Sequence, residues 1–350
     1  MASVVPIPSI QDLRVIFHEK VLVSPSEKTE RKSMFLSNID QMHNYNAHTA
    51  HFFTANPDFP PKIVTERLKM ALEKVLATYD FAAGRLRTNQ ESGRLEIECD
   101  GAGAGFVAAS SEYSLCDLGD DLVFSNPGFR QLSVLFDILP RDDQPLLILQ
   151  VTSFKCGGFA IGTAMNHTLV DGAGAQKLLA VESPTTLWRC RALSSDKERV
   201  VSTLFTSMDI RSRLIPPLPD SYCGNAVLYA EASAKGGDIE KLPFSKLVEL
   251  VWEGPRRFSD EYARSVIDLL EIEKWKLRPR IEYNVTSWLK LGLDQVVYPW
   301  GKPFCVGPIC TVLAHACFLF PSVEGGVNAL VSLPSEEMQR FQAYFHQFFT

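Results

Sequence analysis

The sequence lacks the features of a disulfide-stabilised, secreted or membrane-spanning protein. Its eight cysteines are scattered along 350 residues and form no Cys-x-x-Cys pair. This favours a reduced, cytosolic protein with free thiols and predicts no cysteine zinc site. No apolar run approaches the roughly 20 residues that a membrane-spanning helix needs. The residues after Met1 also lack the basic and apolar regions of a secretion signal.

The sequence also has no excess of basic residues and lacks two common functional motifs. The chain has 35 Lys and Arg residues against 41 Asp and Glu residues, which gives a formal net charge of −6. A nucleic-acid partner is therefore not expected, because no basic excess is available to neutralise phosphates. The sequence contains neither the Gly-x-x-x-x-Gly-Lys-Ser/Thr phosphate loop nor the Gly-x-Ser-x-Gly turn. The second absence disfavours a hydrolase with a nucleophilic serine or cysteine.

What the chain does have is the composition of an ordinary globular protein, with 46% hydrophobic and 22% charged residues. Its length is sufficient for two domains. Pro184 and the charged run at 194–199 interrupt the pattern near the middle of the chain, so we divide it into domains at 1–185 and 186–350. Helices and strands follow one another without regular alternation, which predicts an α+β architecture.

Hydrophobic periodicity predicts the individual elements. Apolar residues at three- and four-residue spacing predict helices at 62–76, 175–179, 245–277 and 336–349. Alternating or short apolar runs predict strands at 95–99, 146–154, 159–165, 201–205, 284–288, 304–306 and 329–333. The polar stretch at 110–129 is expected to be rich in loops.

One histidine lies where an apolar hairpin is expected to end. The two strands on either side of a Cys-Gly-Gly turn at 156–158 are followed by residues 166–172, Asn-His-Thr-Leu-Val-Asp-Gly. This pattern places the imidazole of His167 at the end of a rigid sheet, where a general base is useful. An unperturbed imidazole, with a pKa of about 6.5, is largely neutral in the cytosol. The alternative is a core histidine whose nitrogens are satisfied by backbone groups.

Three further histidines, His43, His48 and His51, cluster near the N-terminus. No cysteine or carboxylate is spaced to complete a zinc site with them, so no bound metal is expected. We expect these side chains to face solvent or a pocket.

Four regions, in this order along nearly the whole chain, resemble the plant BAHD acyltransferases. They are 36–41 (LSNIDQ) with 79–86 (YDFAAGRL), 167–172 (HTLVDG), 209–227 (DIRSRLIPPLPDSYCGNAV), and 286–288 (TSW) with 300–303 (WGKP). The resemblance implies two chloramphenicol-acetyltransferase-like lobes of mixed sheets and flanking helices. A channel between the lobes would admit a coenzyme A thioester from one face and an alcohol from the other.

The resemblance also implies a reaction and its participants. Family members transfer an acyl group from a coenzyme A thioester to an alcohol, with no permanently bound cofactor. The opening segment is most similar to members that feruloylate or caffeoylate long-chain hydroxy fatty acids and fatty alcohols. For this chain we expect a hydroxycinnamoyl donor and a long-chain alcohol acceptor, in a cytosolic monomer.

The resemblance assigns His167 as the general base. Asp171 would pair with Arg211, the first arginine of the Asp-x-Arg-x-Arg segment, in a structural ion pair across the fold. The alternative for Asp171 is a catalytic triad in which it orients His167. Four residues separate the two, so their side chains would meet only on a helix, and the nearby glycines favour a turn instead.

Two residues near the C-terminal motifs are also assigned by the resemblance. Trp288, beside Thr286, would line the acceptor pocket and donate its indole N–H to the tetrahedral intermediate. The alternative is a buried aromatic residue in a strand. Asn225 is expected to fix a loop.

Two departures from the family pattern bear on function. The family's Asp-Phe-Gly-Trp-Gly is replaced by Val-Tyr-Pro-Trp-Gly at 297–301, which we expect to affect folding or cofactor fit more than chemistry. Between Leu179 and Leu187 a short connection replaces a long segment of the relatives, so the first lobe is expected to be incomplete. The alternative function is therefore a catalytically impaired chain that acts only as a binding or relic protein.

Overall fold

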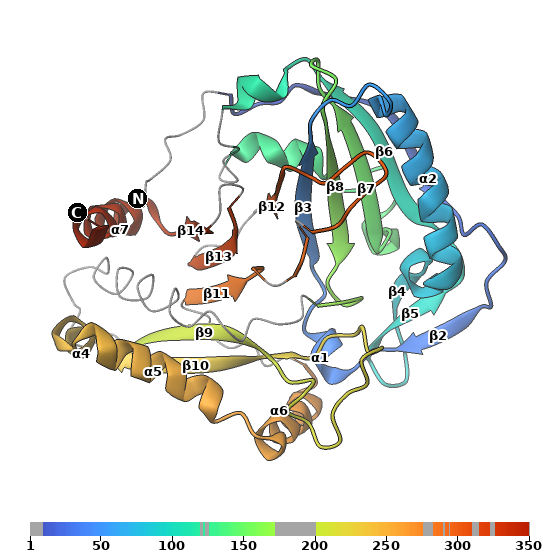
Figure 1. Cartoon of the computed structure of the whole chain (residues 1–350). Helices are drawn as coiled ribbons and strands as arrows, with labels where there is room; N and C mark the ends of the chain where they lie inside the picture. The colour runs from blue at the N-terminus through green and yellow to red at the C-terminus, as the bar shows by residue number, and fades with distance from the viewer. Residues whose placement is uncertain are drawn as a thin grey trace.

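The computed structural model describes residues 10–119, 122, 126–171, 201–275, 283–289, 291–293, 295–309, 315–322 and 326–349. These residues form a mixed α+β structure in which three β-sheets are flanked by helices (Figure 1). The strands are β1 (Val15–Val23), β2 (Lys32–Phe35), β3 (Asn46–Phe53), β4 (Arg85–Thr88), β5 (Leu95–Cys99), β6 (Ala104–Ser111), β7 (Leu147–Ser153), β8 (Phe159–Asn166), β9 (Val201–Asp209), β10 (Val227–Lys235), β11 (Tyr283–Ser287), β12 (Cys305–Pro308), β13 (Ala316–Pro321) and β14 (Val327–Ser332). The α-helices are α1 (Asn38–Gln41), α2 (Pro61–Thr78), α4 (Gly236–Lys241), α5 (Phe244–Arg256), α6 (Asp260–Ile272) and α7 (Ser335–Phe349), and the 3-10 segments are η1 (Asp80–Ala83), η2 (Leu115–Leu118), η3 (Pro127–Leu132) and η4 (Arg141–Asp143).

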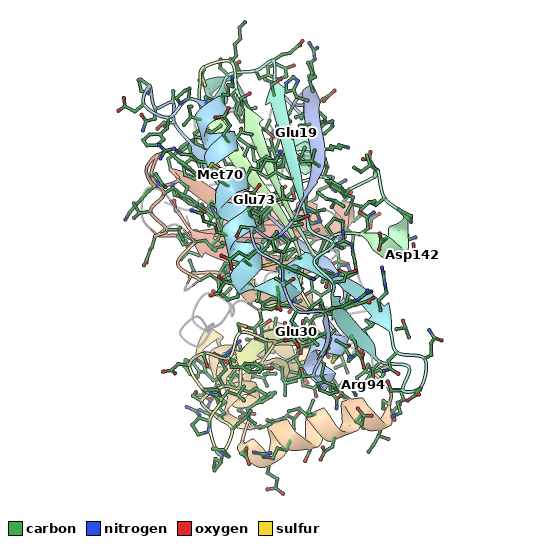
Figure 2. The ribbon with its side chains drawn as sticks, turned by 90° about the vertical axis from the view of Figure 1, so that its right-hand side faces the viewer. Glu19, Glu30, Met70, Glu73, Arg94 and Asp142 are labelled. Atoms are coloured by element: carbon green, nitrogen blue, oxygen red, sulfur yellow. The ribbon has the colours of Figure 1, made fainter. Side chains whose placement is uncertain are left out.

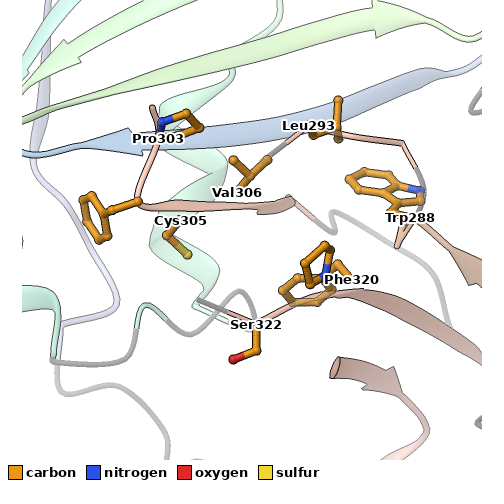
Figure 3. A pocket seen from close by; sticks show the side chains of 9 residues that line it. Trp288, Leu293, Pro303, Cys305, Val306, Phe320 and Ser322 are labelled. Carbon is orange, nitrogen blue, oxygen red and sulfur yellow. The ribbon is translucent and has the colours of Figure 1, made fainter. Parts of the chain in front are cut away.

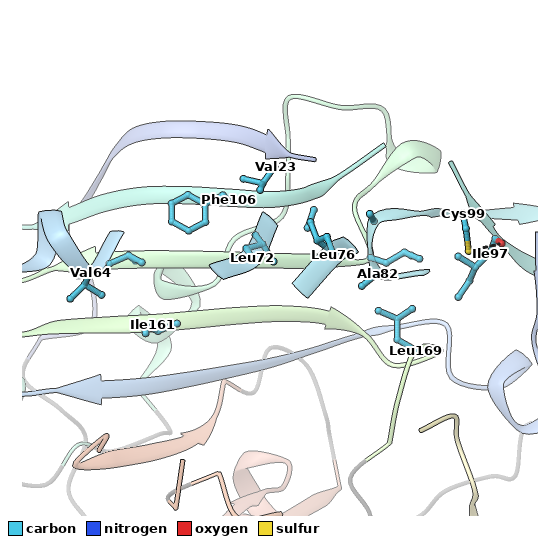
Figure 4. Packing of buried hydrophobic residues seen from close by; sticks show 14 of the residues in the cluster. Val23, Val64, Leu72, Leu76, Ala82, Ile97, Cys99, Phe106, Ile161 and Leu169 are labelled. Atoms are coloured by element: carbon cyan, nitrogen blue, oxygen red, sulfur yellow. Dashed lines mark hydrogen bonds between the residues drawn. The ribbon is translucent and has the colours of Figure 1, made fainter. Parts of the chain in front are cut away.

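The largest sheet has the strand order β1-β6-β7-β8-β3-β12, and helix α2 covers one of its faces (Figure 1). The helix begins with Pro61 at its first position, where a missing N–H costs nothing. Its buried side chains pack against sheet residues such as Phe106 (Figure 4), and they are Val64, Leu72 and Leu76. Burying each such side chain contributes roughly 1.5–3 kcal/mol, so this face of α2 anchors the sheet.

Strands β7 and β8 form the predicted antiparallel hairpin at the centre of this sheet. Gly157 makes the turn with a φ of +84°, a conformation that glycine adopts without a Cβ clash. Further along β8, the position that a Cβ on Gly162 would take is occupied by the backbone carbonyl of Leu132. This close packing holds β8 in place as it runs to Asn166, the residue before His167.

The second sheet has the order β10-β9-β11-β13-β14. Strands β9 and β10 pair antiparallel, and β11 is parallel to both β9 and β13. Helices α4 and α5 run alongside β9 and β10 (Figure 1), and α7 buries Phe341 against Val331 and Leu333. The core of this sheet includes Leu204 and Tyr283.

The smallest sheet, β2-β5-β4, connects the two halves of the chain. Arg94, which is labelled in Figure 2, directly precedes β5. It binds Glu271 of α6 at 2.6 Å, and its guanidinium lies 4.6 and 4.5 Å from the ring centres of Phe35 and Trp275. A second contact between the two halves involves the large sheet, in which β12 from the second half pairs with β3. Both halves therefore contribute to the large sheet, and the boundary predicted at 185/186 lies outside the described residues.

Most of the predicted elements have counterparts in the structure, and the helix predicted at 175–179 lies outside the described residues. The stretch at 245–277 contains two helices, α5 and α6, because the Ser259 hydroxyl caps α6 by accepting from the N–H of Tyr262 at 3.1 Å. The loop-rich stretch at 110–129 contains the end of β6 and the short segments η2 and η3.

Strands β1, β2, β3, β4, β6, β10 and β13 were not predicted. In β3, His48 and His51 interrupt the apolar pattern, yet residues 50–53 of this strand are buried between β8 and β12. Tertiary pairing therefore outweighs the local pattern there.

Candidate active site

His167 lies directly after β8, where the backbone turns. Its N–H donates to the carbonyl oxygen of Tyr45 at 2.8 Å. The side-chain oxygen of Asn166 accepts from the N–H and the hydroxyl of Thr168 at 3.0 and 2.8 Å. The N–H of Leu169 donates to the carbonyl oxygen of Asn166 at 3.1 Å, which closes the turn. The Leu169 side chain packs in the core that α2 covers (Figure 4). These contacts fix the backbone on both sides of the histidine.

The imidazole of His167 is partly buried among other rings. His43 stacks on it, with 4.9 Å between ring centroids and 23° between ring planes, and the Tyr45 ring lies 5.0 Å away. Burial, and secondly the proximity of His43, lower the pKa of His167 to about 4. The ring is therefore neutral at pH 7, and one of its two nitrogens can accept a proton.

Asn225 determines which nitrogen accepts. Its Nδ2 donates to Oδ1 of Asp40 and to the carbonyl oxygen of His167, both at 2.8 Å. Because both partners are acceptors, the amide oxygen of Asn225 must face Nδ1 of His167, which lies 3.0 Å away. Nδ1 therefore carries the ring proton, and Nε2 keeps its lone pair.

Asp171 is directed toward the second half of the chain. Its Oδ1 accepts from Nη2 of Arg211 at 2.6 Å, and its Oδ2 accepts from Nη1 of Arg211 at 3.3 Å and from the N–H of Ala226 at 2.6 Å. Arg211 also donates to the carbonyl oxygen of Gly224 at 2.8 Å. Both carboxylate oxygens are engaged with these partners, while Asn225 binds the histidine. The structure thus brings Asp171 and Arg211 together in the geometry of a structural ion pair.

Trp288 lines a separate pocket. Its ring packs edge-on against Phe318, with 5.9 Å between centroids. The pocket has a volume of about 210 Å³ and is lined mainly by apolar side chains, among them Cys305 and Phe320 (Figure 3). Thr286 lies nearby in β11. The roles of Trp288 and Thr286 toward an acceptor stay predictions.

This pocket and His167 lie toward opposite ends of β3. Cys305 pairs with Phe52, whereas the backbone of His167 is bound at Tyr45. At about 3.3 Å per residue, the two positions are on the order of 20 Å apart along the strand. A ligand that occupies both the pocket and the histidine would have to be long.

The sequence that replaces the family's C-terminal motif forms a tight turn. Tyr298 and Gly301 exchange two backbone hydrogen bonds at 3.1 and 3.0 Å, and Gly301 has a φ of +117°. Pro299 is the second residue of this turn, a position that suits the fixed φ of proline. The rings of Tyr298 and Trp300 stack at 5.2 Å and pack against Phe53. The turn therefore accommodates the substitution within the core.

Neither a metal site nor a membrane span is found in the ranges that the structure describes. No group of three or more His, Cys, Asp or Glu side chains there could hold a metal ion. Nor is any helix there both long and apolar enough to cross a membrane. His43 and His51 are 3% and 6% exposed, so of the expectation that these histidines face solvent or a pocket, the solvent alternative is wrong for both. His48 is partly buried, with Nδ1 2.9 Å from the hydroxyl of Ser133.

Sequence reasoning missed three side chains of this site: His43, Tyr45 and Asp40. The one available signal for Asp40 was its place in the segment at 36–41 that resembles the BAHD acyltransferases. Asn225, which was expected to fix a loop, binds the imidazole.

The Transferase family model matches residues 13–185 and 180–348. The chain therefore belongs to this family, that of the BAHD acyltransferases. Among similar proteins, the Acyltransferase GLAUCE of Arabidopsis thaliana is 39% identical, with 96% of each chain covered. The fatty alcohol:caffeoyl-CoA acyltransferase of the same plant is 26% identical, with 95% of this chain and 98% of the relative covered. Its omega-hydroxypalmitate O-feruloyl transferase is also 26% identical, with 96% and 93% covered.

The alignments show that this chain is shorter than its relatives. The alignment with GLAUCE extends over 437 positions, so a chain of 350 residues leaves at least 87 of them without a counterpart. The two matches to the family model meet at residues 180–185, within the stretch where the sequence predicts a missing segment.

Solved structures show the same fold. Vinorine synthase has a TM-score of 0.76 at 17% identity, with 93% of this chain and 96% of that chain covered. F. sporotrichioides TRI101, complexed with coenzyme A and T-2, has a TM-score of 0.61 at 15% identity, with 89% and 97% covered. The α+β fold class predicted from the sequence is confirmed by these likenesses.

Proposed function

We propose that this chain is an acyl-CoA-dependent O-acyltransferase in which Nε2 of His167 is the general base. The observation that carries the proposal is a neutral imidazole whose Nδ1 is hydrogen-bonded to Oδ1 of Asn225. This arrangement leaves the lone pair of Nε2 available over the whole physiological pH range. General-base assistance of this kind contributes ~10²–10⁴ in rate.

The reaction proceeds by direct transfer. His167 removes the proton of the acceptor hydroxyl as its oxygen attacks the carbonyl carbon of the thioester. The tetrahedral intermediate collapses with cleavage of the C–S bond, and the imidazolium returns its proton to the sulfur of coenzyme A. The acyl group passes straight to the alcohol, and no residue of the protein is acylated. Partial burial of the imidazole limits competition by water.

We assign a hydroxycinnamoyl thioester as the donor and a long-chain hydroxy fatty acid or fatty alcohol as the acceptor. Two relatives support this assignment, since one is named for fatty alcohols and caffeoyl-CoA and the other for omega-hydroxypalmitate and feruloyl transfer. The pocket beside Trp288, which is lined mainly by apolar side chains, also supports it. A long alkyl chain could lie in that pocket and extend its hydroxyl to His167.

We further propose that the protein works as a monomer in the cytosol. Support comes from the free state of the cysteines within the described ranges, which are Cys99, Cys116, Cys156, Cys223, Cys305 and Cys317. Free thiols are typical of a reducing compartment.

A second candidate function is that of a non-catalytic binding or relic protein. The observation that favours it is the gap of at least 87 alignment positions. Apolar surface left uncovered by a missing segment would promote association. Against it stands the site geometry, because His167, Asn225 and the Asp171–Arg211 pair are assembled without that segment.

The test measures ester formation from feruloyl-CoA and hexadecanol by the wild type and by His167→Ala. We expect turnover by the wild type and a loss of at least ~100-fold in the variant. His18→Ala is the matched control, since His18 is an exposed histidine that contacts Ser110, and its turnover should be unchanged. Full turnover by His167→Ala would refute the base assignment. A wild type that binds coenzyme A but forms no ester with any hydroxycinnamoyl thioester would favour the second candidate.

A further inference from the structure

Asp40 is a buried carboxylate to which the reaction above gives no part. It lies in α1, which is a single helical turn, and it is 5% exposed. Its Oδ2 accepts from the N–H and the hydroxyl of Ser37 at 2.8 and 2.7 Å. These bonds form a capping box, in which the two side chains satisfy the free N–H groups at the start of the helix. The cap uses only one of the two carboxylate oxygens.

The other oxygen of Asp40 crosses to the second half of the chain. Oδ1 accepts two hydrogen bonds from Asn225, one from its backbone N–H at 2.9 Å and one from Nδ2 at 2.8 Å. Asn225 lies 185 residues further along the sequence. A helix cap does not need this contact, and its geometry is that of a carboxylate that orients an amide.

The orientation of that amide decides the protonation of His167. If the Asn225 amide rotated by 180°, its oxygen would face the carboxylate of Asp40, where two acceptors repel, and Nδ2 would face Nδ1 of His167. The ring would then carry its proton on Nε2 and could not act as a base. The carbonyl of His167 also favours the observed orientation, but a bond to a carboxylate is about twice as strong as one to a neutral carbonyl.

We propose that Asp40 is a positioning residue, which orients the Asn225 amide and thereby keeps the proton of His167 on Nδ1 and the lone pair on Nε2. This inference rests on the proposed function of His167 as the base. It also links the two halves of the chain, because the tautomer of a histidine after β8 depends on contact between α1 and the segment before β10.

The test compares Asp40→Asn with two control variants. Ser37→Ala removes the same cap of α1 but leaves the carboxylate of Asp40 in place. Asp117→Asn removes the exposed carboxylate of a second capping box, which Ser114 and Asp117 form at η2. Circular dichroism and thermal melting first establish that each variant is folded.

The primary readout is the ¹⁵N spectrum of imidazole nitrogens in protein labelled at histidine, recorded at pH 7. His167→Gln assigns the signals by their loss. In the wild type we expect a protonated Nδ1 and an unprotonated Nε2. In Asp40→Asn both signals should move toward a mixture of tautomers, whereas Ser37→Ala and Asp117→Asn should match the wild type. A purely structural role for Asp40 would not produce this difference.

The second readout is turnover. Removing a partner that orients a functional histidine typically costs ~10–100-fold, so we expect kcat of Asp40→Asn to fall by that factor. KM for the thioester should stay within about twofold of the wild type, because both carboxylate oxygens of Asp40 are engaged by Ser37 and Asn225.

Two results would overturn the proposal. One is a folded Asp40→Asn variant with wild-type imidazole signals, whatever its turnover. The other is a wild type whose His167 carries its proton on Nε2, which is decisive even if Asp40→Asn does not fold. Failure of the base assignment is separate, since activity in His167→Gln would refute the base while the spectra still report the effect of Asp40.

Discussion

Arg211 binds both carboxylate oxygens of Asp171, at 2.6 and 3.3 Å, and the Asp171 side chain is 1% exposed. The pair connects the turn after β8 with the loop between β9 and β10. Its two charges are satisfied by each other, by Ala226 and by Gly224. Asp171 therefore holds the segment that carries His167 against the second sheet, without contacting the imidazole through a hydrogen bond of its own.

We predict that Asp171→Asn is mainly a stability variant. Breaking a buried pair leaves an uncompensated charge, here reduced by Asp209 at 3.2 Å from Arg211, so the free energy of unfolding should fall by about 3 kcal/mol. Urea denaturation measures this loss. The folded variant should keep a kcat within about tenfold of that of the wild type. Unchanged stability with a kcat loss on the order of 10⁴ would instead indicate a triad.

Acid should destabilise the protein through His51, which is buried, and His167, which is partly buried. The pKa of His51 and the pKa of His167 are both lowered to about 4, in each case chiefly by burial. The unfolded chain, with an ordinary histidine pKa of about 6.5, binds protons that the folded state does not bind between pH 6.5 and 4. Stability is therefore fully present above pH 6.5 and is lost as the pH falls toward 4. The loss from pH 7.5 to 5 should be about 2 kcal/mol per histidine.

His51→Leu tests this assignment, because Nδ1 of His51 has no hydrogen-bond partner among the residues that the structure describes, and an apolar side chain can replace it. Urea unfolding at several pH values gives the free energy of unfolding as a function of pH. In His51→Leu, the loss of this free energy with falling pH should be smaller than in the wild type by the contribution of one histidine. An unchanged slope would exclude His51 as a source of the acid sensitivity.

His43→Phe should change the pH dependence of activity. In the wild type, kcat/KM should stay level as the pH falls and decline only near pH 4, where His167 becomes protonated. Phenylalanine keeps a stacked ring but removes the nearby ionisable group that lowers the pKa of His167. The acid limb should therefore move to higher pH. Tyr45→Phe retains the ring beside His167 and serves as the control. Its kcat/KM should decline at the same pH as that of the wild type. An acid limb at the same pH in His43→Phe would contradict the assigned coupling.

Gly162→Ala should destabilise the large sheet. The new Cβ would overlap the backbone carbonyl of Leu132, and backbone displacement of this kind costs typically 1–3 kcal/mol or more. Gly93→Ala provides a comparison, because Gly93 has a φ of +71° but no atom of the described part of the chain within 4 Å of the added Cβ. This variant should lose only about 1 kcal/mol. Denaturation curves that show equal losses for the two variants would argue against close packing of β8.

The sequence was sufficient for the elements that carry the histidine. The hairpin of β7 and β8 has two short apolar runs and a glycine turn, and α2 has a regular apolar face after two prolines. Strand β1 was missed because its pairing is set by β6, which lies far along the chain. Partners that lie far along the chain leave no local periodicity.

The surroundings of His167 could be predicted only in part. The pairing of Asp171 with Arg211 followed from a family resemblance. The stacking of His43 on His167 joins two distant segments of the first half of the chain, and the bond between His167 and Asn225 depends on how the two halves meet. His43 lies 124 positions before His167, and no spacing rule relates them. The same limit applies to Asp40, which looks like an ordinary helix cap until its second oxygen is seen to bind Asn225.

The most direct test of the account is the turnover of His167→Gln, which keeps a polar side chain of similar size but cannot take up a proton. With feruloyl-CoA and a long-chain alcohol, the account predicts a kcat at least ~100-fold below that of the wild type, with the fold and coenzyme A binding retained. Turnover equal to that of the wild type would contradict it.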